Sequence, residues 1–509
     1  MNTFNRNRPS TFLEFHDQCL SLFLLGICLV VMMASGCNKK AAPVDEVVEQ
    51  QIDIPDPMVL FVVGDPGLGK RVARQWSARR DGELTIIDQT VAEFEQQDYE
   101  LPDEVDVIVY PPEMLGELVH RDRLREIPND FLNSDEYNKI GLLRYFRTSV
   151  VRHQNESWAV PLGGPNFSML IHRAFVESID PPETWEQMDR FLLKVAEEIN
   201  SNQQLGNLEA KVDMPLAKGW AAQTLLARVA PAICFRGKLS TVFDRSTIEP
   251  LIANPPFVEA LEQLIAISSA RSSELDPEAV FELAISGQSG LALSWPALGF
   301  NRVEPSRDSG NDTDSGLENE TDRLESLQSR LRIIPLPGME RWYDQKAETW
   351  ISRGKEDDRR VDLIGFSGLV ASVTSRCPNE RTAWDFLQWL PSKSISKLIM
   401  VESPSVGPFR ASHLGDMSRW TGTAISEDVA FEYGDVIQAN HERKLILKFP
   451  RIPGYRRYVE SLDNAVRFAI SGQKTAEEAL SEAAKEWNEI TESFGRSEQI
   501  GELKKETGL

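Results

Sequence analysis

Two residue patterns that follow the apolar runs at 59–63 and 105–110 could take part in chemistry, but one of them lacks an essential residue. Gly64–Lys70 (GDPGLGK) imitates a phosphate-binding loop, but Arg71 stands where that loop needs the serine or threonine that ligates magnesium. The other pattern consists of polar residues placed directly after apolar runs, Asp65 after one and 110–113 (YPPE) after another. Carboxylates at such positions suit hydrogen bonding to a polar ligand.

Motifs for common hydrolases are missing from the chain. It holds no G-x-S-x-G nucleophile motif, and none of its six histidines forms an H-E-x-x-H pair. These absences argue against serine-hydrolase and zinc-hydrolase chemistry. Carboxylates that meet in space could still act on glycosides, and the sequence leaves that alternative open.

The polar residues are positioned by alternating strands and helices. Short apolar runs separated by helical patterns predict an α/β sheet whose strands are largely parallel and covered on both faces. In such sheets ligands lie outside the carboxyl ends of the strands, which again indicates Asp65 and Tyr110–Glu113. The predicted strands are Val59–Val63, Leu84–Asp88 and Val105–Tyr110, and the predicted helices are Lys70–Arg80 and Glu113–His120.

Length and charge narrow the class of protein further. The 509 residues suggest about three structural units, hence at least two lobes. Lys and Arg number 55 against 78 Asp and Glu, so the net charge is −23. A field of that sign repels phosphate backbones and anionic lipid headgroups, which argues against a nucleic-acid-binding protein.

Later segments carry helix starts and an acidic insertion. Capping boxes are predicted at Thr184–Gln187 and Thr475–Glu478, and an aspartate N-cap at Asp276. Residues 304–328 are acidic and nearly free of large apolar groups, so we expect a solvated, disordered insertion there. Its spacing fails the calcium-loop pattern because Asn319 stands at the position of the essential glutamate.

The N-terminus has the pattern of an export signal. Two arginines precede the apolar run Cys19–Met33, and Ala34-Ser35-Gly36-Cys37 follows it. This resembles the lipobox of bacterial lipoproteins, which implies removal of residues 1–36 and lipidation of Cys37. The alternative is an uncleaved membrane anchor. Residues 37–57 then form a flexible tether, and the protein faces the periplasm or the exterior.

Two further cysteines, Cys234 and Cys377, remain after Cys37. An exported pair could form a disulfide. Because the lobe assignment given below places them in different bodies, we expect two free, buried thiols.

Several segments resemble the bacterial extracellular solute-binding proteins of the family that includes maltose-binding protein. The order and spacing of these segments carry the resemblance, which spans nearly all of 58–494. The matching segments are Asp106–Pro128, Trp158–Trp185 with its AVP and PPETW motifs, Gly365–Leu390 and Phe449–Trp487.

The resemblance implies a two-lobed, type II-like fold with a mostly parallel sheet in each lobe. Lobe 1 would comprise 58–160 and 335–395, and lobe 2 would comprise 161–334 and 396–509. Hinge strands would cross between the lobes near 159–162 and 333–337. A ligand would lie in the cleft, and closure would be stabilised by its contacts with both lobes.

The resemblance also implies which side chains touch a solute. Aromatic faces would stack on a sugar, and carboxylates would accept hydrogen bonds from its hydroxyls. Each residue also has a structural alternative: Asp65 could cap a helix, Glu113 could complement a helix dipole, and the aromatic residues could be packing. Arg410 is expected to hold a lobe edge. The predicted ligand-binding residues are Asp65, Tyr110, Glu113, Trp220, Trp295, Tyr455 and Tyr458.

The sequence thus predicts a lipid-anchored, monomeric receptor that captures a carbohydrate or similar polar solute and delivers it to an ABC importer. No cofactor, metal or catalysis is expected. Two alternatives stay open: a receptor of the same fold that serves a membrane sensor, and an exported carbohydrate-active enzyme that uses Asp65 and Glu113.

Overall fold

The computed structural model describes residues 57–507 apart from 66, 80–81, 239, 297–329, 402–404 and 422–424. The described residues belong to one compact unit, Ile54–Leu509. The predicted signal segment and the acidic insertion lie outside the described residues, as does all of the tether but its last residue. None of the helices described is both long and apolar enough to cross a bilayer.

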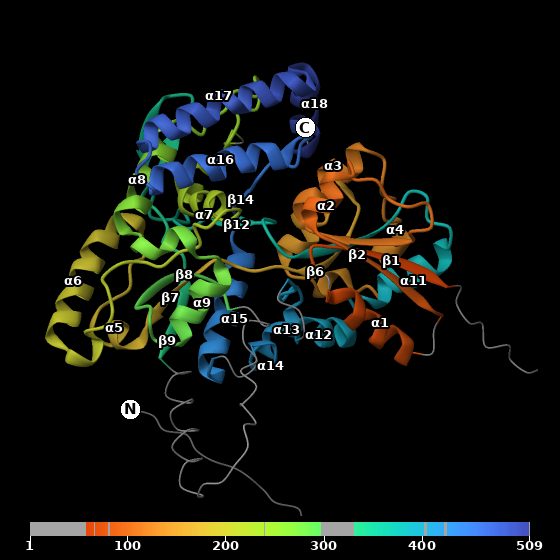
Figure 1. The fold of residues 1–509 in the computed structure, drawn as a ribbon, viewed down its shortest axis with the longest axis horizontal. Helices are drawn as coiled ribbons and strands as arrows, with labels where there is room; N and C mark the ends of the chain where they lie inside the picture. Colours follow the sequence, from red (N-terminus) through yellow and green to blue (C-terminus); the bar gives the residue numbers. More distant parts are fainter. Residues whose placement is uncertain are drawn as a thin grey trace, which may run out of the picture. The chain divides into compact units, whose positions relative to one another are not determined.

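The first lobe is built on a five-stranded sheet of order β2-β1-β3-β13-β6 (Figure 1). β1 (Met58–Val63) is parallel to β2 (Leu84–Gln89) and to β3 (Val107–Tyr110). β13 (Leu369–Val373) runs antiparallel to β3 and to β6 (Val160–Gly163). Every residue of β3, β6 and β13 is buried, as expected for strands covered on both faces.

Amphipathic helices cover this sheet. In the first helix the buried side chains recur at helical spacing, and Trp76 packs against Phe386 and Trp389 with ring centroids 5.1 and 4.9 Å away. The predicted strands and helices of this lobe are confirmed, with small shifts at their ends. The covering elements are α1 (Leu68–Ala78), α2 (Val91–Gln96), η1 (Pro112–Met114), α3 (Leu115–His120), α4 (Asn129–Leu132) and α11 (Glu380–Trp389).

The second lobe has a three-stranded sheet of order β8-β7-β9. β7 (Ser168–His172) is antiparallel to both β8 (Leu291–Ser294) and β9 (Leu331–Pro335). The prediction of a mostly parallel sheet is therefore wrong for this sheet. The reason is that β7, the strand that enters from the first lobe, lies in the middle and runs against both neighbours.

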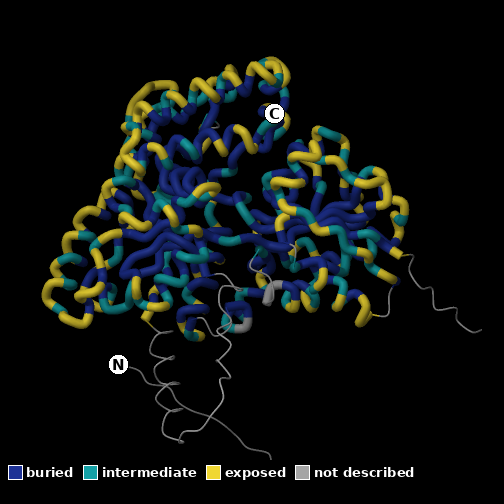
Figure 2. The backbone as a smooth tube through the Cα atoms, viewed as in Figure 1, coloured by how far each residue is buried: buried dark blue, intermediate teal, exposed yellow. Residues whose placement is uncertain are grey.

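Helices surround this second sheet. The central helix, α7 (Ala221–Ile233), is buried on all sides (Figure 2). Asp276 and Thr475 cap their helices as predicted, each accepting a backbone hydrogen bond. Thr184 does not, because a 3-10 turn begins there and its hydroxyl makes no capping bond. The elements are α5 (Arg173–Ser178), η4 (Trp185–Gln187), α6 (Met188–Ser201), η5 (Gln203–Leu205), α7 (Ala221–Ile233), α8 (Pro255–Ile267), η6 (Ala270–Glu274), α9 (Pro277–Ile285), α15 (Glu427–Glu442), α16 (Tyr455–Ile470) and α17 (Ala476–Phe494).

Two small sheets correct the predicted lobe boundary. A hairpin joins β10 (Arg341–Asp344) to β11 (Thr349–Ser352), and β12 (Asp362–Ile364) pairs in parallel with β14 (Ile446–Lys448). Both β10 and β12 pack on α7 of the second lobe. The chain therefore returns to the five-stranded sheet through 365–368, directly before β13, and later than the expected 333–337.

The remaining elements join the lobes or extend them. They include a single π-helical turn, η3, beside the crossovers. Their bounds are η2 (Lys139–Gly141), η3 (Phe146–Val150), β4 (Arg152–His153), β5 (Glu156–Ser157), α12 (Lys393–Val401), α13 (Ala411–Leu414), α14 (Met417–Thr421) and α18 (Arg496–Glu506).

A C-terminal strap, defined as residues 448–456 and α18, ties the second lobe to the first (Figure 1). The buried Arg451 guanidinium donates to the backbone oxygens of Val150, at 2.8 Å, and Arg152. The buried Glu506 carboxylate lies 2.6 Å from the His153 ring and 3.1 Å from Arg451, and it also pairs with a lysine of β14. The strap is thus held by buried charges.

The two described cysteines are free and buried, as predicted. Cys377 lies in the first lobe, where its thiol is 3.3 Å from an oxygen of Asp106. Cys234 is the C-cap of α7 in the second lobe. Burial raises the pKa of each thiol to about 12.

Candidate functional site

Three chain segments cross between the lobes where their backbones touch through glycines. A Cβ on Gly163 would lie 1.9 Å from the carbonyl oxygen of Gly407, and one on Gly368 would lie 2.1 Å from that of Gly163. Gly163 and Gly368 also have φ values of +100° and +98°, which other residues rarely adopt. We call this the glycine junction, residues 163–164, 367–368 and 407.

An aromatic wall lies beside the junction, and sheet register explains its position. Ser168 at the start of β7 pairs with Ser294 at the end of β8, so the residues one step beyond, Phe167 and Trp295, become neighbours. Their ring centroids are 5.1 Å apart. Phe366, from the returning crossover, lies 5.0 Å from Phe167 and 5.8 Å from Trp295.

Trp220 completes the aromatic wall, with its ring 5.6 Å from that of Trp295. It occupies the N-cap position of α7 and is half-buried, whereas the other three rings are buried. Trp220 therefore offers the most accessible ring face. Such a wall can stack against the apolar face of a ligand.

A polar cluster lies where α16 meets η1 of the first lobe. One oxygen of Glu113 is buried and has no hydrogen-bond partner. Burial raises the pKa of this carboxyl to about 7. Burial also raises the pKa of Tyr455, and the charge of Glu113 adds to that effect. Beside them the Arg456 side chain pairs with Glu95 at 2.7 Å. The cluster can hold or release a proton near neutral pH.

The predicted contact Asp65 has a structural task in this fold. Its carboxylate is buried, accepts backbone hydrogen bonds from Gly67 and Leu68 at 3.1 and 3.0 Å, and pairs with Arg71 at 2.9 Å. It therefore fixes the turn that leads into α1. This matches the helix-capping alternative, and it leaves little hydrogen-bonding capacity for a solute.

Two predicted tyrosines lie in the core. Tyr110 is fully buried, and its hydroxyl is 2.8 Å from that of Ser372 in the neighbouring strand β13. Tyr458 is also fully buried, and its hydroxyl is 2.9 Å from Thr491. Neither ring has a face that a solute could reach in this structure.

Arg410 holds a lobe edge, as expected. Its buried guanidinium donates to the backbone oxygens of Pro391 and Tyr137 at 2.6 and 2.8 Å. These bonds fix the segment before α13 against the first lobe.

The structure thus brings Trp220 together with Trp295, and Glu113 together with Tyr455. Asp65 instead caps α1, and Tyr110 and Tyr458 pack in the core. Sequence reasoning missed Phe167 and Phe366. Phe167 directly precedes β7, and Phe366 lies in the crossover between β12 and β13. Their only signal was a large aromatic residue close to glycines, in 163–167 and 365–368.

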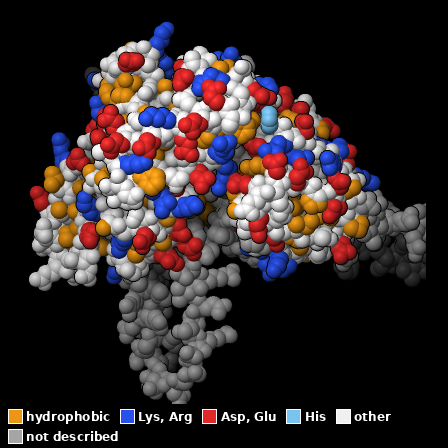
Figure 3. All heavy atoms as spheres, turned by 45° about the horizontal axis from the view of Figure 1, so that its top comes forward, with side chains coloured by type: hydrophobic (Ala, Val, Ile, Leu, Met, Phe, Trp, Pro, Cys, Tyr) orange, Lys and Arg blue, Asp and Glu red, His pale blue; other side chains and the backbone are white. Residues whose placement is uncertain are grey.

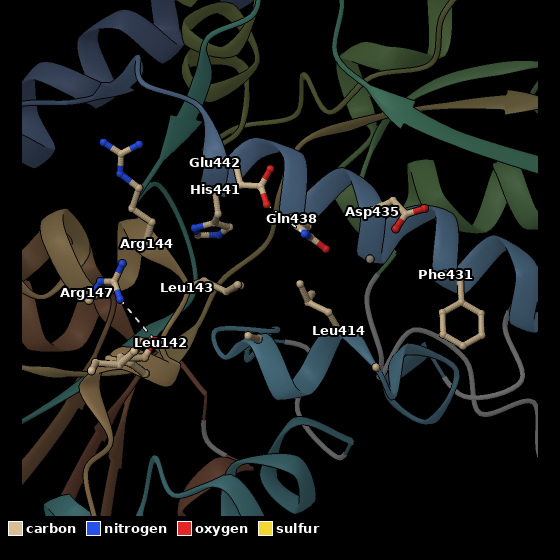
Figure 4. A pocket seen from close by; sticks show the side chains of 14 residues that line it. Leu142, Leu143, Arg144, Arg147, Leu414, Phe431, Asp435, Gln438, His441 and Glu442 are labelled. Atoms are coloured by element: carbon tan, nitrogen blue, oxygen red, sulfur yellow. Dashed lines mark hydrogen bonds between the residues drawn. The ribbon is translucent and has the colours of Figure 1, made fainter. Parts of the chain in front are cut away.

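An open groove beside the junction was also missed (Figure 4). It has a volume of about 510 Å³ and lies between residues 140–147 of the first lobe and helices α13 and α15. Arg144, Arg147, Gln438 and Glu442 give it polar groups, and Gln438 donates to Glu442 at 3.0 Å. The groove joins segments about 300 residues apart, so no local pattern predicts it.

His441 lines the inner end of the groove. Its ring stacks on Phe146 with centroids 5.3 Å apart, and its Nδ1 accepts a hydrogen bond from the backbone of Tyr145 at 3.3 Å. Burial lowers the pKa of His441 to about 3, so the ring is neutral at physiological pH. The inner end is therefore uncharged, while the groove's polar groups lie nearer its mouth.

The visible surface gives no sign of a single charged or apolar face. Figure 3 shows acidic and basic side chains interspersed over the face turned to the viewer. Within the described part of the chain, no three His, Cys, Asp or Glu side chains come together as a metal site would require. The sites to consider are thus the aromatic wall, the polar cluster and the groove.

Comparison with known proteins identifies the fold. No protein-family profile matches the chain. Among solved structures it is similar to maltose-bound MalE3 of T. maritima, with a TM-score of 0.59, 16% identity, and coverage of 85% of this chain and 99% of that one. It is also similar to a ribitol-bound ABC transporter solute-binding protein from Agrobacterium radiobacter K84, with a TM-score of 0.58, 16% identity, and coverage of 85% and 98%.

The sugar-binding protein MalE of Xanthomonas citri gives the same result, with a TM-score of 0.59, 13% identity, and coverage of 86% of this chain and 98% of that one. The chain therefore has the two-lobed α/β fold of the extracellular solute-binding proteins. The predicted fold class and the family resemblance are confirmed at the level of the fold.

Proposed function

We propose that this protein is a non-catalytic receptor that captures a small polar solute between its two lobes. One observation carries the proposal: three crossing segments touch at a glycine junction, and an aromatic wall that includes Phe167 and Phe366 from two of these crossovers lies beside it. Glycine backbones absorb rotation at low cost, so such a junction suits a hinge. A solute that contacts both lobes stabilises the closed form.

The proposed solute is a carbohydrate or a polyol. Trp220 and Trp295 supply rings for the apolar face of a sugar, and Glu113 and Tyr455 supply polar groups from the lobe interface. Proteins of this fold include structures described as bound to maltose, ribitol and maltotetraose. Such ligands combine apolar ring or chain faces with many hydroxyls, which matches the composition of the proposed site.

Delivery to an ABC importer and attachment through a lipidated Cys37 complete the proposal. Cys37 lies outside the described residues, so this part rests on the lipobox-like sequence. Catalysis by paired carboxylates is disfavoured because Asp65 is already engaged in capping α1 and pairing with Arg71. The alternative partner, a membrane sensor, would use the same closure.

The first test is a ligand screen. Residues 54–509 would be melted with and without maltose, maltotetraose and ribitol, and titrated by calorimetry, while chromatography follows any cleavage. We expect saturable stabilisation without products. If no sugar or polyol raises the melting temperature, or if products form, the proposal is overturned.

The second test locates the solute. Trp220→Ala should weaken binding by roughly tenfold or more, because a stacked aromatic anchor carries much of the binding energy of a site. Trp350→Ala, on β11 away from the junction, is the matched control and should not change the affinity. If Arg147→Gln and Gln438→Ala weaken binding while Trp220→Ala does not, the solute binds in the groove of Figure 4 instead.

A further inference from the structure

A second cavity lies at the opposite end of α7 from the aromatic wall. It has a volume of about 460 Å³, within the range of small-molecule sites. Its walls come from the segment after α7, from β14 and from α18, and Ser149 of the first lobe closes one side. We call it the C-terminal cavity. The residues that matter below are Lys238, Phe243, Arg245, Lys444, Lys448 and Glu506.

The cavity is basic in a protein that is strongly acidic. The whole chain carries a net charge of −23, yet the charged side chains that line this cavity are four cations and one carboxylate. The carboxylate, Glu506, is neutralised from within the protein, because His153, Lys448 and Arg451 all lie within 3.1 Å of it. It therefore does not cancel the charge of the remaining cations.

Two of these cations have no ion-pair partner among the residues that the structure describes. Lys238 is paired with Asp344 at 2.7 Å. Arg245 and Lys444, by contrast, form no salt bridge and donate no side-chain hydrogen bond to any residue that the structure describes. Two cations at the edge of a concave site raise the local concentration of anions.

Most of the other large side chains that line the cavity are apolar, and Ser149, Thr241 and Thr507 add hydroxyl groups. Phe235, Phe243, Leu445, Leu447 and Leu503 contribute carbon surface, and Phe243 is anchored by its packing against Trp487 at 4.8 Å. A preformed apolar wall with a few convergent charged groups is the usual composition of a small-molecule site. Its ligand should therefore combine one anionic group with an apolar body.

This cavity is separate from the aromatic wall. Trp220 stands at the N-cap of α7 and Cys234 at its C-cap, with thirteen residues between them. At 1.5 Å per residue the two ends are roughly 20 Å apart. A ligand here would touch the C-terminal strap and Ser149 rather than the proposed solute site.

We propose that the C-terminal cavity is a second binding site, distinct from the solute site, for an amphipathic monoanion: an aryl or alkyl carboxylate, sulfonate or phosphodiester. The anionic group would bind between Arg245 and Lys444, and the apolar body would lie against Phe243 and the leucines. Because the walls include α18, β14 and the first lobe, an occupant would also reinforce the strap.

The test uses a matched pair of probes. 8-Anilinonaphthalene-1-sulfonate carries an aromatic body and one sulfonate, and N-phenyl-1-naphthylamine has the same body without the charge. Fluorescence titration of residues 54–509 should give one saturable site for the sulfonate and binding of the neutral probe weaker by roughly tenfold or more, since the charged hydrogen bonds are lost.

The Arg245→Gln/Lys444→Gln double variant should weaken the sulfonate by roughly tenfold or more. The control, Arg190→Gln/Lys194→Gln, changes the net charge equally on the exposed face of α6 and should leave binding unchanged. Thermal melting checks that both variants fold. Equal binding of the two probes by the parent chain, no saturable site, or equal loss in both double variants overturns the proposal. Because the readout does not involve a sugar, it is independent of the proposed receptor function.

Discussion

The lobes of this protein are joined in two contrasting ways. At the glycine junction, backbones touch directly and side chains are absent at the points of contact. At the C-terminal strap, the contact is made by long side chains whose charges are buried, centred on Arg451 and Glu506. One contact permits rotation because glycine tolerates many φ and ψ values. The other resists separation because a buried ion cannot lose its partners cheaply.

The comparison indicates which contact between the lobes would permit rotation and which would oppose their separation. If the lobes rotate about the glycine junction, the strap must either move with one lobe or break. Arg451 donates to backbone oxygens of the first lobe, while α16 packs on α7 and α17 of the second. In the proposed hinge motion, the strap would therefore limit how far the lobes separate, and the junction would provide the axis.

The largest expected effect comes from filling the junction. Gly163→Ala would place a methyl group 1.9 Å from a backbone oxygen at a φ of +100°, so we expect a loss of about 5 kcal/mol or more in unfolding free energy. The control is Gly219→Ala, with a φ of +92° and no atom within 4 Å, which should cost only about 1 kcal/mol. Urea denaturation measures both. Equal losses would show that backbone strain, rather than close packing, limits this position.

The next effect comes from breaking the strap. Glu506→Gln leaves the buried Arg451 and the partly exposed Lys448 without their carboxylate, which should lower the unfolding free energy by about 4 kcal/mol. Glu482→Gln, whose partner Lys474 lies in an exposed pair, should change it by less than about 1 kcal/mol. Chemical denaturation of the two variants measures the difference in unfolding free energy. A loss as small as that of the control would show that the buried charges of the strap do not hold the lobes together.

The third effect is a pH dependence at the same interface. Burial raises the pKa of Glu113 to about 7 in the folded chain, above the value of 4.5 expected when unfolded. Its contribution is therefore fully present below pH 4.5 and is lost as the pH rises through 7. The parent chain should lose up to about 3 kcal/mol of unfolding free energy over that range relative to Glu113→Gln.

Denaturant melts of both chains at several pH values measure this difference, because other titrating groups are common to both. Parallel stability curves for the parent and the variant would show that Glu113 titrates normally.

The smallest effect comes from the exposed edge of the interface. Arg456 pairs with Glu95 while remaining half-exposed, so Arg456→Gln should cost at most about 1 kcal/mol. The loss should shrink at high salt because exposed pairs are screened. Repeating the denaturation at low and high ionic strength tests this, and a salt-independent loss of several kcal/mol would place Arg456 with the buried charges instead.

Sequence reasoning predicted the first lobe well and the second less well. β1 and β3 are continuous apolar runs and β2 is a short β-branched segment, all close together in the chain, so local pattern identifies them. The insertion of β13 between β3 and β6 depends on pairing across about 260 residues, which no local pattern reveals. The antiparallel sheet of the second lobe was missed for the same reason, because strand direction depends on how distant segments enter a sheet.

The candidate site was predicted only in part. Trp220 and Trp295 were found through resemblance, but their neighbours Phe167 and Phe366 depend on the register of β7 and the position of the returning crossover. Tyr110 ends a strand that is buried on both faces, so its ring points into the core although its position suggested the ligand loop. The end of such a strand indicates where the ligand loop lies, but it does not indicate which way the side chain of the last strand residue points.

Each lobe contains one free thiol, whose reactivity can report the local opening of that lobe. Residues 54–509 contain only Cys377, in the first lobe, and Cys234, in the second, and both sulfurs are shielded and protonated in the native protein. Alkylation at mildly alkaline pH must therefore wait for local opening, since the thiolate is the reactive form. Peptide mapping of the alkylated cysteines would measure the rate of local opening in each lobe separately, without any engineered cysteine.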